Sequence, residues 1–156
     1  SASAAELCAI ISAIAEVPIR QDIAMTGSVD QNGRVQAVGG LDEKIEGFYT
    51  ACQAIAPNHP VGVILPEDNV RHLMLRPDIT EAMGEGKLTI WPVTRVEAAL
   101  EILTGVSAER IDELVEERLE SLRESVRGPS GGGESTIILP DQATVPTGPH
   151  DPNPKR

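Results

Sequence analysis

Two short aliphatic segments, each followed by a helical pattern, constrain the fold more than any other feature of this sequence. "VGVIL" at residues 61–65 and "KLTIWPV" at 87–93 have the length and aliphatic content of buried strands. The residues between them predict an irregular helix interrupted by a proline. After the second segment, Thr94 and Glu97 form a capping-box pattern, which predicts a helix ending near Gly105. Strand, helix, strand and helix in this order predict two parallel strands joined by a right-handed crossover.

Helical and strand-like patterns account for most of the remaining sequence. A segment rich in Ala, Ile and Leu predicts a helix over residues 2–16, and a long amphipathic pattern predicts another over 107–127. Residues 22–29 and 34–38 are strand-like and flank the turn residues at 30–33, so they predict a hairpin with a longer loop. The apolar stripe of the 107–127 helix is suited to packing on its own domain or on a neighbouring subunit.

The composition changes abruptly at Gly128. "GPSGGG" begins there, and six of the chain's twelve prolines lie in residues 128–156. This segment has too little apolar surface to offset the entropy lost on ordering, so it is predicted to be a disordered tail. Residues 106–127, just before it, form the predicted C-terminal amphipathic helix.

Charge and cysteine content restrict the classes of partner and the site types. The net charge of −11 argues against nucleic acid or an anionic membrane surface as a partner, and no apolar run approaches the roughly 20 residues of a membrane span. Cys8 and Cys52 both fall on predicted apolar helix faces, so we expect reduced thiols in a cytoplasmic protein. His59, His72 and His150 are far apart and lack ligand spacing, so no metal site is expected.

One lysine stands out in the helix predicted from "GGLDEKIEGFYTACQAI", residues 39–55. Its apolar stripe is formed by Leu41, Ile45, Phe48, Cys52 and Ile55. Lys44 projects between Leu41 and Phe48, on the flank of this stripe. One interpretation is that its aliphatic stem covers apolar surface while the amine reaches water. The other is a desolvated, functional lysine.

A desolvated lysine has a chemical use if a hydroxyl nucleophile is near. Burial disfavours the ammonium form, and the neutral amine can take the proton of a serine hydroxyl. The candidate serines are Ser1, Ser3, Ser12 and Ser28. Ser1 and Ser3 lie at the start of the first helix, where free N–H groups favour developing negative charge. Spacing does not choose between these two, and a serine at a helix start is more often a cap than a nucleophile.

The first 47 residues closely resemble the catalytic stretch of Lon-type serine proteases, in the branch whose nucleophile lies in a Gly-Asp-Ser-Ala-Ser context. The matching landmarks are the opening Ser-Ala-Ser, "PIR", "DIAMTG", "GRV", "VGG" and "EK". "NVRHLMLRPDI" and "VEAALEILTG" are similar to the closing elements of the domain, especially in Lon-related ATP-dependent proteases. The resemblance covers residues 1–105 and implies the C-terminal part of the Lon proteolytic domain, an α+β fold of short sheets packed with helices.

The resemblance assigns roles to individual residues. Ser1 matches the nucleophile of the family, and Lys44 matches its general base. Thr26 matches the threonine that orients the lysine amine. Gly39 and Gly40 match the pair that turns the chain into the lysine's helix. The second serine of the motif, Ser3, is not catalytic in this family.

An activity and a set of partners also follow from the resemblance. It implies cleavage of unfolded or damaged protein to peptides through an acyl-enzyme, as part of cytoplasmic protein quality control, with backbone N–H groups near Ser1 holding the oxyanion. It implies a homo-oligomer, most often a hexameric ring. No cofactor is expected in this chain. "GEGKLT" at 84–89 departs from a phosphate-binding loop at Glu81 and Leu88, so ATP would act through an ATPase module outside this sequence.

Other interpretations remain open from the sequence. The chain begins at the nucleophile, without the β-rich segment and the Gly-Asp that precede it in the family, so we expect an excised or processed piece whose activity alone is in question. One alternative is therefore a catalytically incompetent fragment that acts only in assembly or interaction. The α-amine of Ser1 is an alternative base. A small α/β ligand-binding domain is the third interpretation, supported only by the pattern at 61–104.

Overall fold

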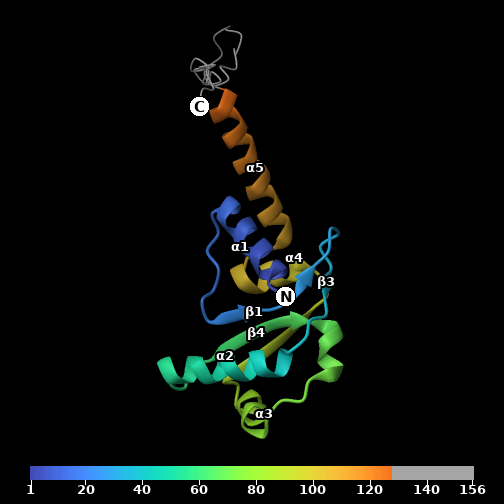
Figure 1. Cartoon of the computed structure of the whole chain (residues 1–156). Coiled ribbons are helices and arrows are strands. Elements are labelled where there is room, and N and C mark those ends of the chain that lie inside the picture. The colour runs from blue at the N-terminus through green and yellow to red at the C-terminus, as the bar shows by residue number, and fades with distance from the viewer. Residues whose placement is uncertain (128–156) are drawn as a thin grey trace, which may run out of the picture.

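A three-stranded parallel sheet forms the centre of the computed structural model, which describes residues 1–127 (Figure 1). Its strand order is β1–β4–β5, with β1 at Ile23–Met25, β4 at Val61–Pro66 and β5 at Leu88–Val93. The pairing of β4 with β5 runs in parallel from Val61↔Leu88 to Pro66↔Val93, as the sequence predicts. The predicted tail and His150 lie outside the described residues.

Helices cover both faces of this sheet (Figure 1). On one side lie α1 (Ser3–Ala15), α4 (Val96–Thr104) and the first half of α5 (Ala108–Arg127). On the other side lie α2 (Leu41–Ile55) and α3 (Pro77–Gly84). Small parallel and antiparallel sheets packed with helices confirm the predicted α+β class.

Two cores follow from the alternation of side chains along β4, all of whose residues are buried. Val61, Val63 and Leu65 pack with α2 and α3. Ile64 faces the other way and packs with residues of α1, α4 and α5. Both cores are mainly aliphatic, as expected for a strand that is covered on both faces.

The predicted hairpin over 22–29 and 34–38 is only half right. β2 (Ser28–Val29) and β3 (Val35–Gln36) do pair in antiparallel orientation. Residues 23–25, however, form β1, which pairs in parallel with β4. The predicted single strand is therefore divided between two sheets.

The division occurs at Gly27, where the chain is bound to the start of α1. The amide of Gly27 donates to the carbonyl of Ser1 at 3.0 Å, and its carbonyl accepts from the amide of Ala4 at 3.3 Å. A Cβ atom at position 27 would lie 2.9 Å from Cγ1 of Val35, so only glycine fits this close approach. These contacts join residues far apart in the sequence, which is why local patterns do not reveal them.

The predicted capping box at Thr94 and Glu97 does not form. α4 begins one residue later than that pattern requires, and its N-cap residue, Arg95, makes no capping hydrogen bond through its side chain. The amide of Val96 instead donates to the carbonyl of Gly33 in the hairpin loop at 2.9 Å. The Glu97 carboxylate accepts a hydrogen bond from Arg95 at 2.6 Å. A tertiary acceptor has therefore replaced the local cap.

The segment between β4 and β5 also differs in detail from the irregular helix that the sequence predicts. It contains a 3₁₀ helix, η1, at Glu67–His72, followed by α3. Pro77 does not interrupt a helix but occupies the first position of α3, where its missing N–H costs nothing. Within residues 1–127, no helix is both long and apolar enough to cross a membrane.

Candidate active site

Lys44 is placed by the turn that leads into α2. Gly40 has a φ of 65° and a ψ of 37°, a left-handed conformation that favours glycine, and α2 begins at the next residue. Leu41 and Ile45 are buried beneath the helix. Lys44 lies one residue before Ile45 in the chain, so its side chain emerges at the edge of the buried face, beside the end of β1.

The amine of Lys44 reaches the hydroxyl of Thr26, at the end of β1. Lys44 Nζ donates to Thr26 Oγ1 across 3.4 Å. The same hydroxyl donates a long hydrogen bond of 3.5 Å to the backbone carbonyl of Ser1. The amide of Thr26 donates to the carbonyl of Ile64 at 3.0 Å, which fixes Thr26 against the sheet. Thr26 therefore connects the lysine on α2 with the serine in front of α1.

Ser1, Thr26 and Lys44 line one pocket of about 280 Å³. The rest of its wall is apolar and is formed by Ala2, Ala5, Ala24, Met25, Ile45, Phe48 and Val63. No hydrogen bond joins Ser1 Oγ to Lys44 Nζ within residues 1–127, and the Ser1 side chain is exposed. The pocket is suited to holding an apolar side chain of a peptide next to a hydroxyl and an amine.

The expectation that Lys44 is desolvated is wrong for this structure, because Lys44 is exposed. Its long stem starts at the edge of the apolar stripe and carries the amine to the rim of the pocket, where water reaches it. Exposure agrees with the first of the two interpretations of this helix. The hydrogen bond to Thr26 shows that the amine is nevertheless held toward Ser1 rather than away from it.

The other candidate serines have structural roles or lie outside the pocket. Ser3 Oγ accepts a hydrogen bond from the amide of Val29 at 3.1 Å. Ser12 Oγ donates to the carbonyl of Val17 at 2.6 Å. Ser28 lies in β2, and none of these three lines the pocket of Lys44. The structure thus separates Ser1 from Ser3, which the spacing alone does not.

Two acids on α2 position the helix. Asp42 Oδ1 accepts from the amide of Met74 at 3.0 Å, and Glu46 Oε1 accepts from the amide of Arg76 at 2.9 Å. Glu46 also forms an ion pair with Arg76 at 3.4 Å. Together they hold the segment after η1 against α2. Helical periodicity carries no signal for this, because an acid that binds a distant amide looks the same as a solvated one.

Asn69 is a further positioning residue that the sequence analysis missed. It is the buried polar residue of the described part of the chain, with 9% of its surface exposed. Its Oδ1 accepts from the amide of Val38 at 3.0 Å, and its Nδ2 donates to the Val38 carbonyl at 2.8 Å. The side chain thereby imitates a strand pairing just before the glycine turn at 39–40. The available signal was a polar "PEDN" directly after a buried strand.

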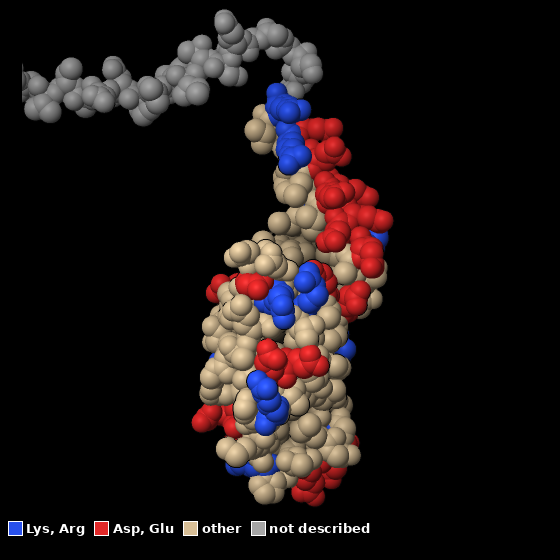
Figure 2. All heavy atoms as spheres, turned by 90° about the vertical axis from the view of Figure 1, so that its right-hand side faces the viewer, with Lys and Arg blue, Asp and Glu red and all other residues tan. Residues whose placement is uncertain are grey.

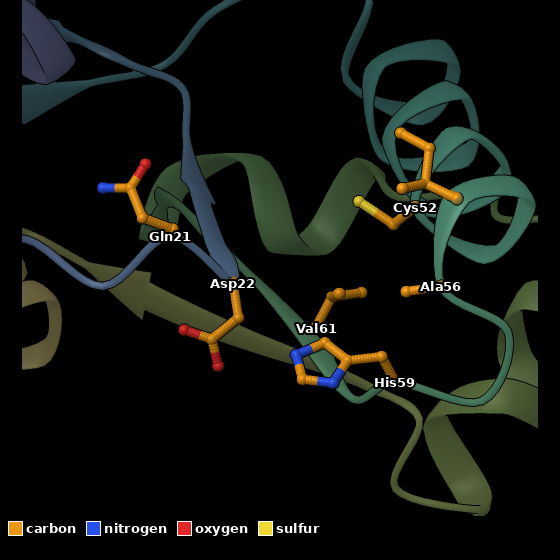
Figure 3. Close-up of a pocket in the computed structure, with 7 residues that line it drawn as sticks. Gln21, Asp22, Cys52, Ala56, His59 and Val61 are labelled. Atoms are coloured by element: carbon orange, nitrogen blue, oxygen red, sulfur yellow. The ribbon is translucent and has the colours of Figure 1, made fainter.

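A larger hollow of about 460 Å³ lies near the opposite end of α2 (Figure 3). Asp22 and His59 lie close together in it, and Cys52 projects from α2. The hydrogen bond from Arg20 holds the pKa of Asp22 below its usual range, with a smaller contribution from His59. No serine lines this hollow, and within residues 1–127 no group of three or more His, Cys, Asp and Glu side chains is arranged to hold a metal ion. The predicted catalytic residues all lie at the smaller pocket.

Comparison with known proteins identifies the family. Residues 1–105 match the model of the Lon protease (S16) C-terminal proteolytic domain. A Lon protease homolog of Escherichia coli K12 is 58% identical over 103 residues, which cover 66% of this chain and 18% of that protein. A Lon protease homolog of Haemophilus influenzae is 38% identical over 138 residues, covering 81% of this chain and 23% of that protein. An archaeal Lon protease of Pyrococcus abyssi is 39% identical over 122 residues, covering 78% and 11%.

These relatives are much longer than the chain, which spans about a fifth of the first two. The similarity nevertheless extends over most of this sequence, and the matched range, residues 1–105, contains Ser1, Thr26 and Lys44. The resemblance seen in the sequence is therefore confirmed: the chain belongs to the Lon protease family.

Proposed function

We propose that this chain carries the catalytic centre of a Lon-type serine endopeptidase, with Ser1 as the nucleophile and Lys44 as the general base. The observation that carries the proposal is that both residues line one pocket and that Thr26 connects them. A Lon-type protease needs a hydroxyl and an amine within reach of one peptide bond, and this pocket supplies both.

The reaction proceeds through an acyl-enzyme. Once a bound substrate has covered the exposed amine of Lys44 and excluded water from it, the neutral amine takes the proton of Ser1 while Oγ attacks the peptide carbonyl, and the resulting ammonium then protonates the leaving amine. A water molecule, deprotonated by the same amine, hydrolyses the ester. Thr26 accepts one N–H of Lys44, which leaves the nitrogen lone pair free to turn toward Ser1.

The oxyanion is assigned to backbone N–H groups at the start of α1. The N-cap residue of this helix, Ala2, provides no capping hydrogen bond through its side chain, so the first amides are not occupied by one. The amide of Ala4 already donates to Gly27 and is excluded from this role. The remaining amides next to Ser1 lie at the positive end of the helix dipole, where negative charge is favoured.

The substrates that fit this proposal are unfolded or damaged proteins, cleaved to peptides. An extended chain can reach a pocket at the edge of the sheet, whereas a folded protein cannot present a backbone there. Since the chain spans about a fifth of its two Lon homologs, the wider context is also proposed. That context comprises a cytoplasmic homo-oligomer, a hexameric ring in the family, with ATP used by a separate ATPase module.

The alternative is a catalytically incompetent fragment that serves assembly or interaction. Two observations favour it: Lys44 is exposed, and no hydrogen bond joins its amine to Ser1 Oγ within the described residues. In this case the pocket would be a remnant of the catalytic centre, and the helices would carry the function.

Covalent labelling distinguishes these proposals. A peptide boronate or a fluorophosphonate should modify Ser1 of the whole chain, as measured by intact mass and peptide mapping. Lys44→Met keeps the stem and removes the base, so it should abolish the adduct without changing the melting temperature. Thr26→Val should slow labelling, whereas Thr26→Ser, which keeps the hydroxyl, should preserve it.

A further variant tests the α-amine of Ser1 as the base. A glycine placed before Ser1 removes that amine but leaves Lys44 in place, and labelling should persist. Loss of labelling in this variant, with normal labelling of Lys44→Met, would assign the base to the terminus. No adduct on well-folded wild-type chain would support the assembly alternative.

A further inference from the structure

The apolar stripe of α5 continues beyond the part of the helix that packs on the domain. Ile111 is buried, with 1% of its surface exposed, between α5 and the rest of the core. Toward the C-terminal end the exposed fraction rises to 39% for Leu119, 45% for Leu122 and 88% for Val126. In Figure 1 this end of α5 projects away from the body of the molecule. A hydrophobic stripe is therefore presented without a covering element in the described part of the chain.

The spacing of this stripe is that of a two-helix contact. Val115, Leu119, Leu122 and Val126 follow one another at intervals of four, three and four residues, as at the apolar positions of a heptad. A shallow hollow of about 370 Å³ lies along Leu119, Leu122 and Val126. Its remaining lining is the pair of arginines at 123 and 127.

One flank of the stripe is already covered by α1. Leu114, Arg118 and Ser121 line a hollow shared with the end of α1, and Arg118 forms an ion pair with Glu16 at 3.1 Å. A second helix must therefore approach from the other flank.

That other flank has a distinctive order of charges. At 100° per residue, five charged residues of this flank fall within an arc of roughly 60°. In chain order they are Glu109, Asp112, Glu116, Arg123 and Arg127, three acids followed by two bases. No salt bridge involves any of the five within residues 1–127. Figure 2 shows the same trend, with acidic side chains along α5 and basic ones at its C-terminal end.

This order is complementary to itself only when two helices run in opposite directions. In an antiparallel pair, Asp112 faces the partner's Arg127 and Glu116 faces the partner's Arg123, and two-fold symmetry repeats both contacts. The same alignment brings Leu119 next to the partner's Leu122. A parallel pair would instead bring like charges to the same level, which opposes association.

We propose that α5 is a homotypic docking surface, on which a second copy of this chain packs its own α5 in antiparallel orientation. The contact extends from residue 112 to residue 127, about 23 Å of helix at 1.5 Å per residue. A two-helix contact of this length lies at the small end of specific interfaces. The association is therefore weak, concentration-dependent and sensitive to salt, because its flanking charges are exposed. It does not depend on whether the pocket of Ser1 is catalytic.

Charge reversal tests the pairing in the whole chain. Wild type should show a monomer–dimer equilibrium by sedimentation velocity, and raising the salt concentration should shift it toward monomer. Asp112→Arg with Glu116→Arg makes the contacting part of this flank, residues 112–127, basic, and Arg123→Glu with Arg127→Glu makes it acidic. Each double variant alone should dimerise at least about tenfold more weakly than wild type, and an equimolar mixture should recover the dimer.

Cross-linking tests the direction of the helices. In a Cys52→Ser background, Leu119→Cys should be joined to its own copy by a short bismaleimide, because residue 119 lies close to the two-fold axis. Val126→Cys should not be joined to itself, since antiparallel pairing in this register separates the two copies by about 20 Å along the helix. A mixture of Val126→Cys and Val115→Cys should be joined.

Three results would overturn the proposal. These are a wild-type chain that stays monomeric at all concentrations, a mixture of the two charge variants that is no more dimeric than either variant alone, and self-linkage of Val126→Cys. The last of these would indicate a parallel pair. Circular dichroism of each variant shows whether α5 itself remains helical.

Discussion

Replacing Gly62 by alanine tests how tightly β4 packs against β5. The six-membered ring of Trp91 lies over this glycine, and a Cβ atom there would be 1.9 Å from Cζ3 and 2.6 Å from Cη2. An ordinary carbon–carbon contact is about 3.5 Å, so the ring would have to retreat by roughly 1.5 Å. Trp91 packs against the core beneath α1 and α4, so this movement disturbs more than one residue.

The expected cost follows from two opposing effects. Overpacking of this kind destabilises a folded domain by about 1–3 kcal/mol. The lower backbone entropy of alanine in the unfolded chain offsets about 0.5–1 kcal/mol of this. The net loss of about 1–2 kcal/mol corresponds to a melting temperature lower by roughly 4–8 °C for a domain of this size.

The assay is thermal unfolding followed by circular dichroism and by fluorescence. The chain contains one tryptophan, so its emission reports on Trp91 alone and should shift to longer wavelength as the ring is displaced. Gly47→Ala is the matched control, because a Cβ there meets nothing within 4 Å, and it should stabilise α2 slightly. If Gly62→Ala melts at or above the wild-type temperature with unchanged emission, the packing of Trp91 on Gly62 is not as described.

Two further predictions concern the supports of the site and the core thiol. Asn69→Ala leaves the amide and carbonyl of Val38 without their partners and should cost about 1–3 kcal/mol, measured by chemical denaturation; Asn69→Asp keeps one acceptor but loses the donor, and should also be destabilising. If Asn69→Ala is as stable as wild type, the hydrogen bonds of Asn69 to Val38 do not stabilise the segment before α2. Burial raises the pKa of the Cys8 thiol to about 11 from its ordinary value of 9.0, so the contribution of this thiol to stability should be constant below pH 9 and fall between about pH 9 and 11, where only the unfolded chain loses this proton. Iodoacetamide should accordingly modify Cys52 in the native state and Cys8 only after unfolding, and equal rates would contradict the burial of Cys8.

Elements defined by periodicity were predictable, because their pattern is local. The buried strands β4 and β5 follow from their short aliphatic segments, and their parallel pairing follows from the order of strands and helices. The helices α2 and α5 follow from the spacing of their apolar residues. The division of the strand at Gly27 was not predictable in this way. It depends on hydrogen bonds from Gly27 to Ser1 and Ala4, which become neighbours only once α1 has packed on the sheet.

The surroundings of the site were likewise not predictable from local sequence patterns. Resemblance to the Lon family named Ser1, Thr26 and Lys44, and the structure brings the three to one pocket. Periodicity left both a solvated and a desolvated Lys44 open, because a residue on the flank of a stripe is as close to water as to the core. Its exposure depends on the atoms around the rim of the pocket, and these come from α1, β1 and α2 together.

The hydroxyl and the amine of the pocket belong to opposite layers of the molecule. Ser1 moves with α1, above the sheet, and Lys44 moves with α2, below it, while Thr26 directly follows the strand β1 between them. Their separation is thus the combined result of two packing arrangements, one on each face of the same sheet. A cavity opened in either core, even far from the pocket, would alter the distance between the hydroxyl of Ser1 and the amine of Lys44. The rate of covalent labelling at Ser1 would therefore report on how the two layers pack against the sheet.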